Sequence, residues 1–434
     1  MKVSGERAAA ADIEVLRGLP GSITVERLAN GLTLCLLENR QAPLVTTALW
    51  YRAGTRDEAR GQGGIAHFLE HMMFKGSARF GPGEIDRRTQ ALGGANNAFT
   101  SHDATAYYFN FAADRWTEAL AIESDRMAGL LLDPEQVASE RQVILEEIAM
   151  YDSEPWDALE LEVQARLFGR HTYGCPVLGT AEELLAIGRE ELAAFHRRFY
   201  RPDNAVLVVA GDLGPDVFDA VASTLGELPA DGFGREPVSP PIYPARLEQL
   251  ERRKGEVPRL LLALPAPPGG HPDHAAVRLL VTLLGSGRTS RLYRALVDVG
   301  QLCVWASADL SESQGPGQLS VSAEVVPAAA PETVEREVLD QLARLTTEVV
   351  PEEEMARAKQ VALADWVFGH ERVHQQALAA GFALALFDLD HLERELERLV
   401  AVTPERLLEA ADRYLRPELG GVLGWSLPKS EGGR

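Results

Sequence analysis

The sequence predicts an α+β protein made of two homologous domains, each a mostly antiparallel sheet packed with helices. Alternating apolar runs that are close together along the chain, followed by clusters of helical patterns, favour this class over a doubly wound parallel sheet. An internal repeat predicts the duplication, because Arg201-Pro202 and Arg416-Pro417 each follow an amphipathic helix and lie 215 residues apart. Pro134 and Pro351, each at the first turn of a predicted helix, lie 217 residues apart. A period this long indicates a repeated domain, not a short solenoid unit.

The first half contains the clearest patterns for single elements. Apolar runs of strand type predict strands at Leu32–Leu37, Leu44–Tyr51, Ala104–Phe111 and Ala205–Ala210. Helical periodicity predicts helices at about 62–74, 83–92, 114–131, 134–151 and 189–199. A segment that is dense in proline and glycine separates the two halves, and it shows neither helical nor strand periodicity. We therefore expect an N-terminal domain at 1–228, a linker at 229–246 and a homologous C-terminal domain at 247–434.

Composition and charge exclude several classes of protein. The 434 residues include 43 basic and 64 acidic side chains, a net charge of −21, so nucleic acid is not an expected partner. No apolar run approaches the roughly 20 residues that span a bilayer, and the N-terminal segment lacks the apolar core of a secretory signal. The three cysteines form no C-x-x-C pair, which excludes a disulfide framework and a thiolate zinc cage. We therefore expect a cytoplasmic protein with no membrane partner.

The strongest chemical signal is the segment His67-Phe68-Leu69-Glu70-His71. At 100° per residue, the two histidines and the glutamate share one face of a helix. Two imidazoles one turn apart can bind one Zn²⁺, and the carboxylate between them can reach a water on the metal. The alternative is a pair of surface histidines beside an acid, but this spacing is rare by chance in a chain with ten histidines. The motif therefore predicts a metal site.

A zinc site that performs catalysis commonly has three protein ligands, so a third ligand is needed. The predicted helix from Glu140 to Ile148 offers three carboxylates. Glu140 and Glu147 are two turns apart and share a face, whereas Glu146 points about 100° away. The same charges would also suit a solvated helix face, so the spacing alone leaves the third ligand open.

A second pair of histidines competes for the metal. The segment His370-Glu371-Arg372-Val373-His374 has the H-E-x-x-H order of ordinary zincins, and Glu393, Glu395 and Glu397 follow it. Arg372 inside the motif would place a fixed cation close to the metal ion and repel it. No glycine turn or third histidine of the metzincin kind follows. The favoured interpretation is a surface helix that happens to carry two imidazoles.

These residues together resemble the pitrilysin family of inverted zincins, whose hallmark is the order H-x-x-E-H. The family places a glutamate ligand about 76 residues after the second histidine, which here selects Glu147, and another glutamate seven residues earlier, here Glu140. The run from Gly94 to Thr100 looks like the family's edge strand. The likeness covers nearly the whole chain, including the duplicated halves.

The resemblance implies a zinc endopeptidase with one Zn²⁺ per chain, held by His67, His71 and Glu147. Glu70 would be the general base that activates water, and Glu140 would orient a ligand histidine. A peptide substrate would bind as an added strand on the predicted edge strand, which favours unfolded segments over folded proteins. The residues of that strand expected to bind substrate are Asn97, Ala98, Phe99 and Thr100.

One departure from the family pattern concerns a possible partner. Active members carry an Arg and a Tyr seven residues apart after a Ser-Arg-Leu turn, and here Val297 and Val304 occupy these positions, with Tyr293 and Arg294 as the alternative pair. Valine donates no hydrogen bond. We therefore expect a heterodimer in which a homologous partner chain supplies the Arg/Tyr pair, and we favour it over a homodimer. A non-catalytic scaffold subunit of the same family is the alternative function.

Overall fold

The computed structural model describes residues 22–230 and 232–429. Residues 1–21, where the sequence predicts no secretory signal, lie outside this range. The chain forms two compact units. Unit 1 comprises the chain up to Ile148, together with Pro176–Pro237 and Val367–Arg394, and unit 2 comprises Ala149–Cys175, Val238–Trp366 and the chain from Glu395 onward.

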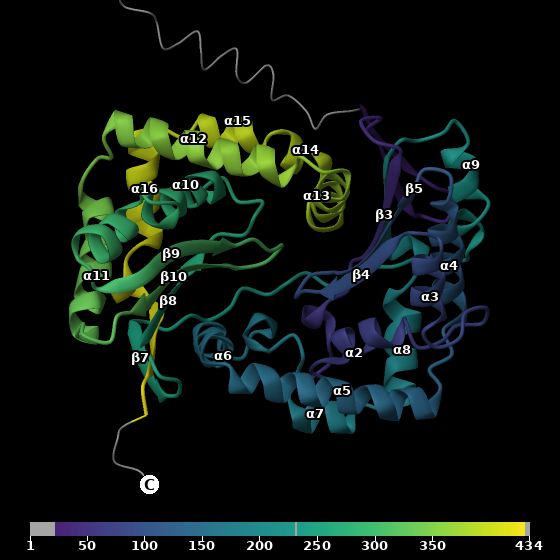
Figure 1. Ribbon diagram of the computed structural model, residues 1–434, viewed down its shortest axis with the longest axis horizontal. Helices are drawn as coiled ribbons and strands as arrows, with labels where there is room; N and C mark the ends of the chain where they lie inside the picture. Colours follow the sequence, from purple (N-terminus) through teal and green to yellow (C-terminus); the bar gives the residue numbers. More distant parts are fainter. Residues whose placement is uncertain (1–21, 231, 430–434) are drawn as a thin grey trace, which may run out of the picture. The chain divides into compact units, whose positions relative to one another are not determined.

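The sheet of unit 1 has six strands in the order β1-β2-β6-β3-β5-β4; β3, β4 and β5 are labelled in Figure 1. Neighbouring strands are antiparallel except for the parallel pair β2 and β6. β4 pairs with β5 and forms one edge of the sheet. The strands are β1 Ser22–Arg27, β2 Thr33–Glu38, β3 Leu44–Tyr51, β4 Ala95–Thr100, β5 Thr105–Ala112 and β6 Ala205–Gly211.

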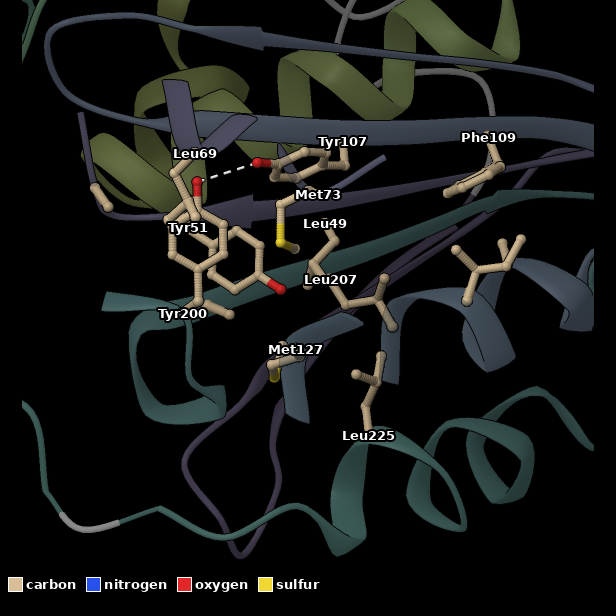
Figure 2. Close-up of a cluster of buried hydrophobic side chains, with 14 of the residues drawn as sticks. Leu49, Tyr51, Leu69, Met73, Tyr107, Phe109, Met127, Tyr200, Leu207 and Leu225 are labelled. Carbon is tan, nitrogen blue, oxygen red and sulfur yellow. Dashed lines mark hydrogen bonds between the residues drawn. The ribbon is translucent and has the colours of Figure 1, made fainter. Parts of the chain in front are cut away.

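One face of this sheet packs against helices of unit 1 and forms a dry core. Tyr51, Tyr107 and Leu207 from three strands meet Leu69 of α2 and Met127 of α4 there (Figure 2). The short β6 is buried along its whole length, as expected for a continuous apolar run at the centre of a sheet covered on both faces. The helices of this unit are α2 Ile65–Met72, α3 Glu84–Ala91, α4 Thr117–Gly129, α5 Pro134–Ser153 (up to Ile148), α7 Ala181–Ala186, α8 Arg189–Phe199, α9 Val217–Ala222, α13 Val373–Leu386 and α14 Leu389–Glu393.

The sheet of unit 2 has five strands in the order β7-β11-β8-β10-β9, with β7 and β11 as the parallel pair. Its strands are β7 Leu247–Arg253, β8 Arg259–Ala266, β9 Cys303–Ser311, β10 Gly317–Val325 and β11 Gly421–Leu427. Its helices are α6 Pro155–Phe168, α10 His274–Gly285, the π-helix η5 Tyr293–Val299, α11 Pro331–Thr347, α12 Glu352–Gly369 (up to Trp366), α15 Glu395–Val400 and α16 Pro404–Tyr414.

The two sheets share one topology, which agrees with the duplication that the sequence predicts. In chain order β2, β3, β4, β5 and β6 correspond to β7, β8, β9, β10 and β11, and the order across each sheet is then identical. The single parallel pair also falls at the same place in both sheets. The fold class is therefore α+β with two repeated, mostly antiparallel sheets, as predicted.

The compact units differ from the two halves of the sequence because each sheet is covered by a helix from the other half. α13 belongs to the second half, yet it packs on β3 and β6 of unit 1, beside the purple strand β3 in Figure 1. Arg52 donates to the carbonyls of Leu384 and Ala385 at the end of α13, at 2.9 and 3.0 Å. In unit 2, α6 from the first half packs on β8 and β11.

Most predicted elements of the first half appear close to their expected bounds. β3 spans the predicted Leu44–Tyr51, and the other three strands are shifted by a residue at one end or both. The helix expected at 62–74 is shorter, because Gly64 has a φ of 86° and the helix begins only at Ile65. Apart from residue 231, which is not described, residues 229–246 form no helix or strand.

Candidate metal centre

The helix that carries the motif is held at its first turn by the side chain of Glu58 and by close backbone packing. Glu58 accepts hydrogen bonds from the backbone N–H groups of Gly64 and Ala66, at 3.1 and 3.0 Å. These groups have no partner inside a helix, so the buried acceptor satisfies this end. Burial raises the pKa of Glu58 to about 8, against the two hydrogen bonds, so the acceptor is mostly uncharged near pH 7. A Cβ on Gly64 would lie 2.3 Å from the carbonyl oxygen of Leu178. Only glycine permits this approach, and α2 is therefore seated at a defined position.

Three of the predicted ligands converge on one point between α2 and α5. The carboxylate Oε2 of Glu147 lies 3.9 Å from Nε2 of His67 and 3.8 Å from Nε2 of His71. The two imidazole rings are 4.5 Å apart, and one ligand atom from each of the three residues lies within 4.8 Å of the others. Donors bound to one tetrahedral Zn²⁺ lie about 3.3 Å apart, so small side-chain adjustments suffice. Two imidazoles and a carboxylate are also the donor set that zinc accepts in catalytic sites.

The protonation state of His67 suits a metal ligand. Its side chain is 10% exposed, and burial, with a smaller effect of the neighbouring His71, lowers the pKa of His67 to about 3. The ring is therefore neutral near pH 7, as a ligand must be. Burial raises the pKa of Glu147 above its ordinary value, against the attraction of His71. A bound cation would oppose that effect and favour the carboxylate form.

Glu140 lies directly behind His71 on the same face of α5 as Glu147. Its Oε1 is 2.8 Å from Nδ1 of His71, and its Oε2 is 2.7 Å from Nζ of Lys75. Burial alone would raise the pKa of Glu140, but the hydrogen bonds from His71 and Lys75 outweigh burial and lower it. An ionised Glu140 accepts the Nδ1 proton of His71 and leaves Nε2 of that ring free to face Glu147.

Lys75 was not found by sequence reasoning, although a signal for it exists. It lies three residues after the end of α2, and the signal is a basic side chain in the sequence close behind the second histidine of the motif. Its ammonium group neutralises Glu140, so the carboxylate behind the ligand histidine carries no uncompensated charge.

Glu70 points from α2 toward the end of the edge strand. Its carboxylate is buried, and Oε2 accepts a hydrogen bond of 2.6 Å from the hydroxyl of Thr100. Burial raises the pKa of Glu70, although the hydrogen bond from Thr100 opposes this. A carboxylate with a raised pKa is better suited to accept a proton near neutral pH than an exposed one.

The predicted substrate strand is β4. Side chains along β4 alternate, with Asn97 and Phe99 exposed and Ala98 and Thr100 half-buried. Asn97 accepts from the backbone N–H of Ala98 at 2.9 Å. Phe99 packs edge-to-face on Trp50, with 5.3 Å between ring centroids. Among the described strands, β5 is the partner of β4, and its other edge is unpaired.

The competing histidine pair has no zincin geometry. His370 lies in a turn before α13, which begins at Val373, so His370, Glu371 and His374 do not share one helix face. The backbone carbonyl of His370 accepts from Gln376 at 2.8 Å. Glu395, considered as its third ligand, accepts from the indole N–H of Trp366 and pairs with Arg278. Within the described residues, the one cluster of histidine, cysteine and acidic groups arranged for a metal is the one at His67.

The two valines at the family's Arg and Tyr positions offer no polar group. Val297 lies in η5 and packs against the core of unit 2, and Val304 in β9 is 57% exposed. Arg291 of the Ser-Arg-Leu turn forms a two-bond ion pair with Glu354, at 2.8 and 2.9 Å. Of the alternative pair, Tyr293 is half-buried and Arg294 is exposed.

The chain is a duplicated α+β protein with a group of side chains suited to hold one metal ion, and comparisons with known proteins show the family to which it belongs. Residues 34–181 match the model of the insulinase family (peptidase family M16), and residues 186–362 match that of the peptidase M16 inactive domain. An uncharacterized zinc protease of Mycobacterium tuberculosis is 30% identical over 390 residues, 87% of this chain and 88% of that protein. One of Streptomyces coelicolor is 28% identical over 439 residues, 96% of this chain and 94% of that protein.

A solved structure shows the same fold. The crystal structure of a protease from Helicobacter pylori has a TM-score of 0.88 and 24% identity, and the match covers 95% of this chain and 100% of that one. The chain belongs to the insulinase family, peptidase family M16, which is the pitrilysin family that the sequence resembles. Among its described helices, none combines the length and apolar character needed to cross a membrane.

Proposed function

We propose that this protein is a zinc-dependent endopeptidase that cleaves peptides or unfolded segments. The observation that carries the proposal is the arrangement around α2. Three groups suited to hold one Zn²⁺, His67, His71 and Glu147, converge beside Glu70, a buried carboxylate that is not used as a ligand. A structural zinc site has no need of this extra base, because such sites close all four positions with protein ligands.

Each residue has a distinct role in this proposal. His67, His71 and Glu147 would hold the zinc ion, which when bound would supply acidification of a water molecule and polarisation of the scissile carbonyl. Glu70 accepts a proton from that water and returns it to the amide nitrogen of the leaving segment. Glu140 holds His71 by accepting from its Nδ1, and Lys75 keeps Glu140 ionised.

The substrate is held as an additional strand on β4. The free edge of β4 offers backbone donors and acceptors, so an extended peptide gains affinity from main-chain hydrogen bonds and sequence preference is loose. A folded protein has few unpaired backbone groups to offer. Asn97, Ala98, Phe99 and Thr100 would line this docking site.

A homologous partner chain completes the site in this proposal. Val297 and Val304 occupy the positions where active relatives of the family carry Arg and Tyr, and neither side chain can stabilise a developing negative charge. We therefore propose a heterodimer in which this chain supplies the zinc ligands and the partner supplies an Arg/Tyr pair. The partner would be of similar length and would lack H-x-x-E-H.

A non-catalytic scaffold subunit of the same family is the second candidate. It is favoured by the two valines and by the match of residues 186–362 to a domain model described as inactive. Glu70 argues against it, because a buried carboxylate costs desolvation energy without contributing to a scaffold.

The test compares the wild-type chain with Glu70→Gln. Both proteins should bind one zinc ion per chain, measured by elemental analysis. Hydrolysis of a quenched fluorescent unfolded peptide, assayed alone and with the homologous chain, should be lost in E70Q. Equal hydrolysis by both proteins, or a wild-type chain that binds no zinc, would contradict the endopeptidase. A zinc-bound wild type without hydrolysis in either assay would favour the scaffold, and full turnover by the wild type alone would contradict the heterodimer.

A further inference from the structure

Thr100 connects the edge strand to the proposed base. It is the last residue of β4, and its hydroxyl donates to Oε2 of Glu70 over 2.6 Å. This distance is typical of a strong hydrogen bond from a hydroxyl to a carboxylate. In the part of the chain that the structure describes, this hydroxyl is the hydrogen-bond donor to the Glu70 carboxylate. Oε1 of Glu70 therefore remains available for a substrate proton.

The neighbouring hydroxyl of Thr105 competes with Glu70 for the proton of Thr100. Thr105 pairs with Thr100 across β4 and β5, and the two hydroxyl oxygens are 3.3 Å apart. Thr105 is fully buried and donates its own proton to the carbonyl of Ala53 at 2.9 Å. Each hydroxyl has one proton, so Thr105 has none left for Thr100 and faces it only as an acceptor at 3.3 Å. The proton of Thr100 goes to the closer acceptor, the Glu70 carboxylate at 2.6 Å.

The position of Thr100 also depends on the strand that would receive the peptide. Thr100 lies on the half-buried face of β4, together with Ala98, while Asn97 and Phe99 lie on the opposite, exposed face. Its side chain is therefore directed to α2, and the free backbone edge of the same strand remains open to a substrate. A peptide that pairs with this edge restrains the backbone that places the Thr100 hydroxyl.

We propose that Thr100 is a positioning residue that orients the carboxylate of Glu70 and links its orientation to peptide docking on β4. The proposal rests on the proposed peptidase function. Its expected kinetic effect is on kcat, because the hydroxyl acts through Glu70 and contributes no backbone group to the docked peptide. KM, which reflects main-chain pairing with β4 when chemistry is slow, should change little.

Three variants test this proposal. Thr100→Val keeps the shape and removes the donor, and Thr100→Ser keeps the donor and removes a methyl group. Thr47→Val is the matched control, because Thr47 lies on β3 of the same sheet and its buried hydroxyl has no hydrogen-bond partner among the described residues. Removing a hydrogen-bond donor that orients a functional side chain lowers activity about 10–100-fold. The kcat of T100V, which lacks the hydroxyl that donates to Glu70, should therefore fall by that factor. T100S and T47V should stay close to the wild type, and all four proteins should hold equal zinc.

Crystal structures of T100V and T100S provide a readout that does not depend on activity. The Glu70 carboxylate should rotate away from its wild-type position in T100V and keep it in T100S. An unmoved carboxylate in T100V, a kcat equal to that of T47V, or a loss of zinc in T100V would each overturn the proposal. The kinetic assays are run alone and with the homologous chain. A wild type that hydrolyses no peptide in either assay would contradict the proposed function instead, and the crystal structures would still decide the role of Thr100.

Discussion

The two units share one sheet topology but differ in the side chains of the helix that follows the corresponding strands β3 and β8. After β3, unit 1 continues into α2, which carries two histidines and a glutamate, whereas after β8, unit 2 continues into α10. α10 is rich in leucine and buried along most of its length. The same architecture thus carries a polar cluster on the helix after β3 in unit 1 and an apolar helix at the corresponding place in unit 2. The fold provides positions, and the side chains at those positions determine the function.

The helices α5 and α12 differ in the same way. Counted from Pro134 and Pro351, the positions of Glu140 and Glu147 correspond to Arg357 and Ala364. Arg357 pairs with Glu353 one turn away, as on an ordinary helix surface. Unit 2 therefore retains the helix but lacks the acids that a metal site requires.

The largest effect, on zinc affinity, is expected from replacing Glu147, whose counterpart in unit 2 is Ala364. Glu147→Gln should weaken zinc binding by more than about 100-fold, beyond the 10–100-fold expected for a residue behind a ligand, because it removes one of three ligands. Glu146→Gln, at the exposed neighbouring position, should bind zinc as the wild type does. Competition with a chelating fluorophore measures both affinities. Equal losses in the two variants would show that Glu147 is not a ligand.

The second prediction concerns α13, the helix from the second half of the sequence that packs on the sheet of unit 1. Gly381→Ala should lower the free energy of unfolding by about 1–3 kcal/mol, because its Cβ would lie 2.0 Å from Nε1 of the buried Trp50. Gly369→Ala, at the end of α12, has open space around it and should be neutral or slightly stabilising. Denaturant unfolding of both variants measures the difference. Equal stabilities would contradict the close packing of α13 on the sheet of unit 1.

Lys75 should have a smaller effect on the metal. Lys75→Met leaves Glu140 without its cation, so we expect zinc affinity to fall about 10-fold, the lower limit for groups behind a ligand. Lys75→Arg should retain most of the affinity, since a guanidinium can also pair with the carboxylate. Zinc affinities measured at one ionic strength test this prediction. An unchanged affinity in K75M would show that Glu140 needs no counter-charge.

The smallest effect concerns the dependence of stability on pH. Burial lowers the pKa of His196 to about 4, whereas its counterpart 215 residues later is the apolar Ala411. Below about pH 6.5 the unfolded chain binds a proton that the folded chain does not bind, so the free energy of unfolding falls as pH falls from 6.5 toward 4.

His196→Gln should remove this part of the pH dependence, about 1 kcal/mol between pH 7 and 5.5. Unfolding curves of wild type and variant at both pH values provide the measurement. If the two proteins lose the same stability on acidification, His196 is not the group responsible.

Local patterns predicted much of the fold and of the candidate site. The apolar run Leu44–Tyr51 formed a strand with the predicted bounds, because such a run is a local property of the chain. The two predicted ligands on α2 lie one turn apart, so helix geometry alone placed His67 and His71 together. The choice of Glu147 over Glu146 needed the family resemblance, because both acids suit a helix.

Contacts between distant segments could not be predicted in this way. Nothing in the sequence of α13 indicates that it covers β3 and β6 in unit 1, because an apolar helix face fits any sheet of suitable shape. Thr100 was expected to bind substrate, and its hydrogen bond to Glu70, thirty residues away, emerged only from the structure.

By itself, the sequence determined the duplicated α+β architecture, most element bounds in the first half, and the two histidines of the candidate centre. These features follow from periodicity and spacing, which act over a few residues. Only the tertiary structure decided which helix covers which sheet, which side chains stand behind the ligands, and which hydroxyl holds the proposed base. Those choices depend on non-directional apolar packing and on hydrogen bonds between groups far apart in the chain, and neither leaves a local pattern.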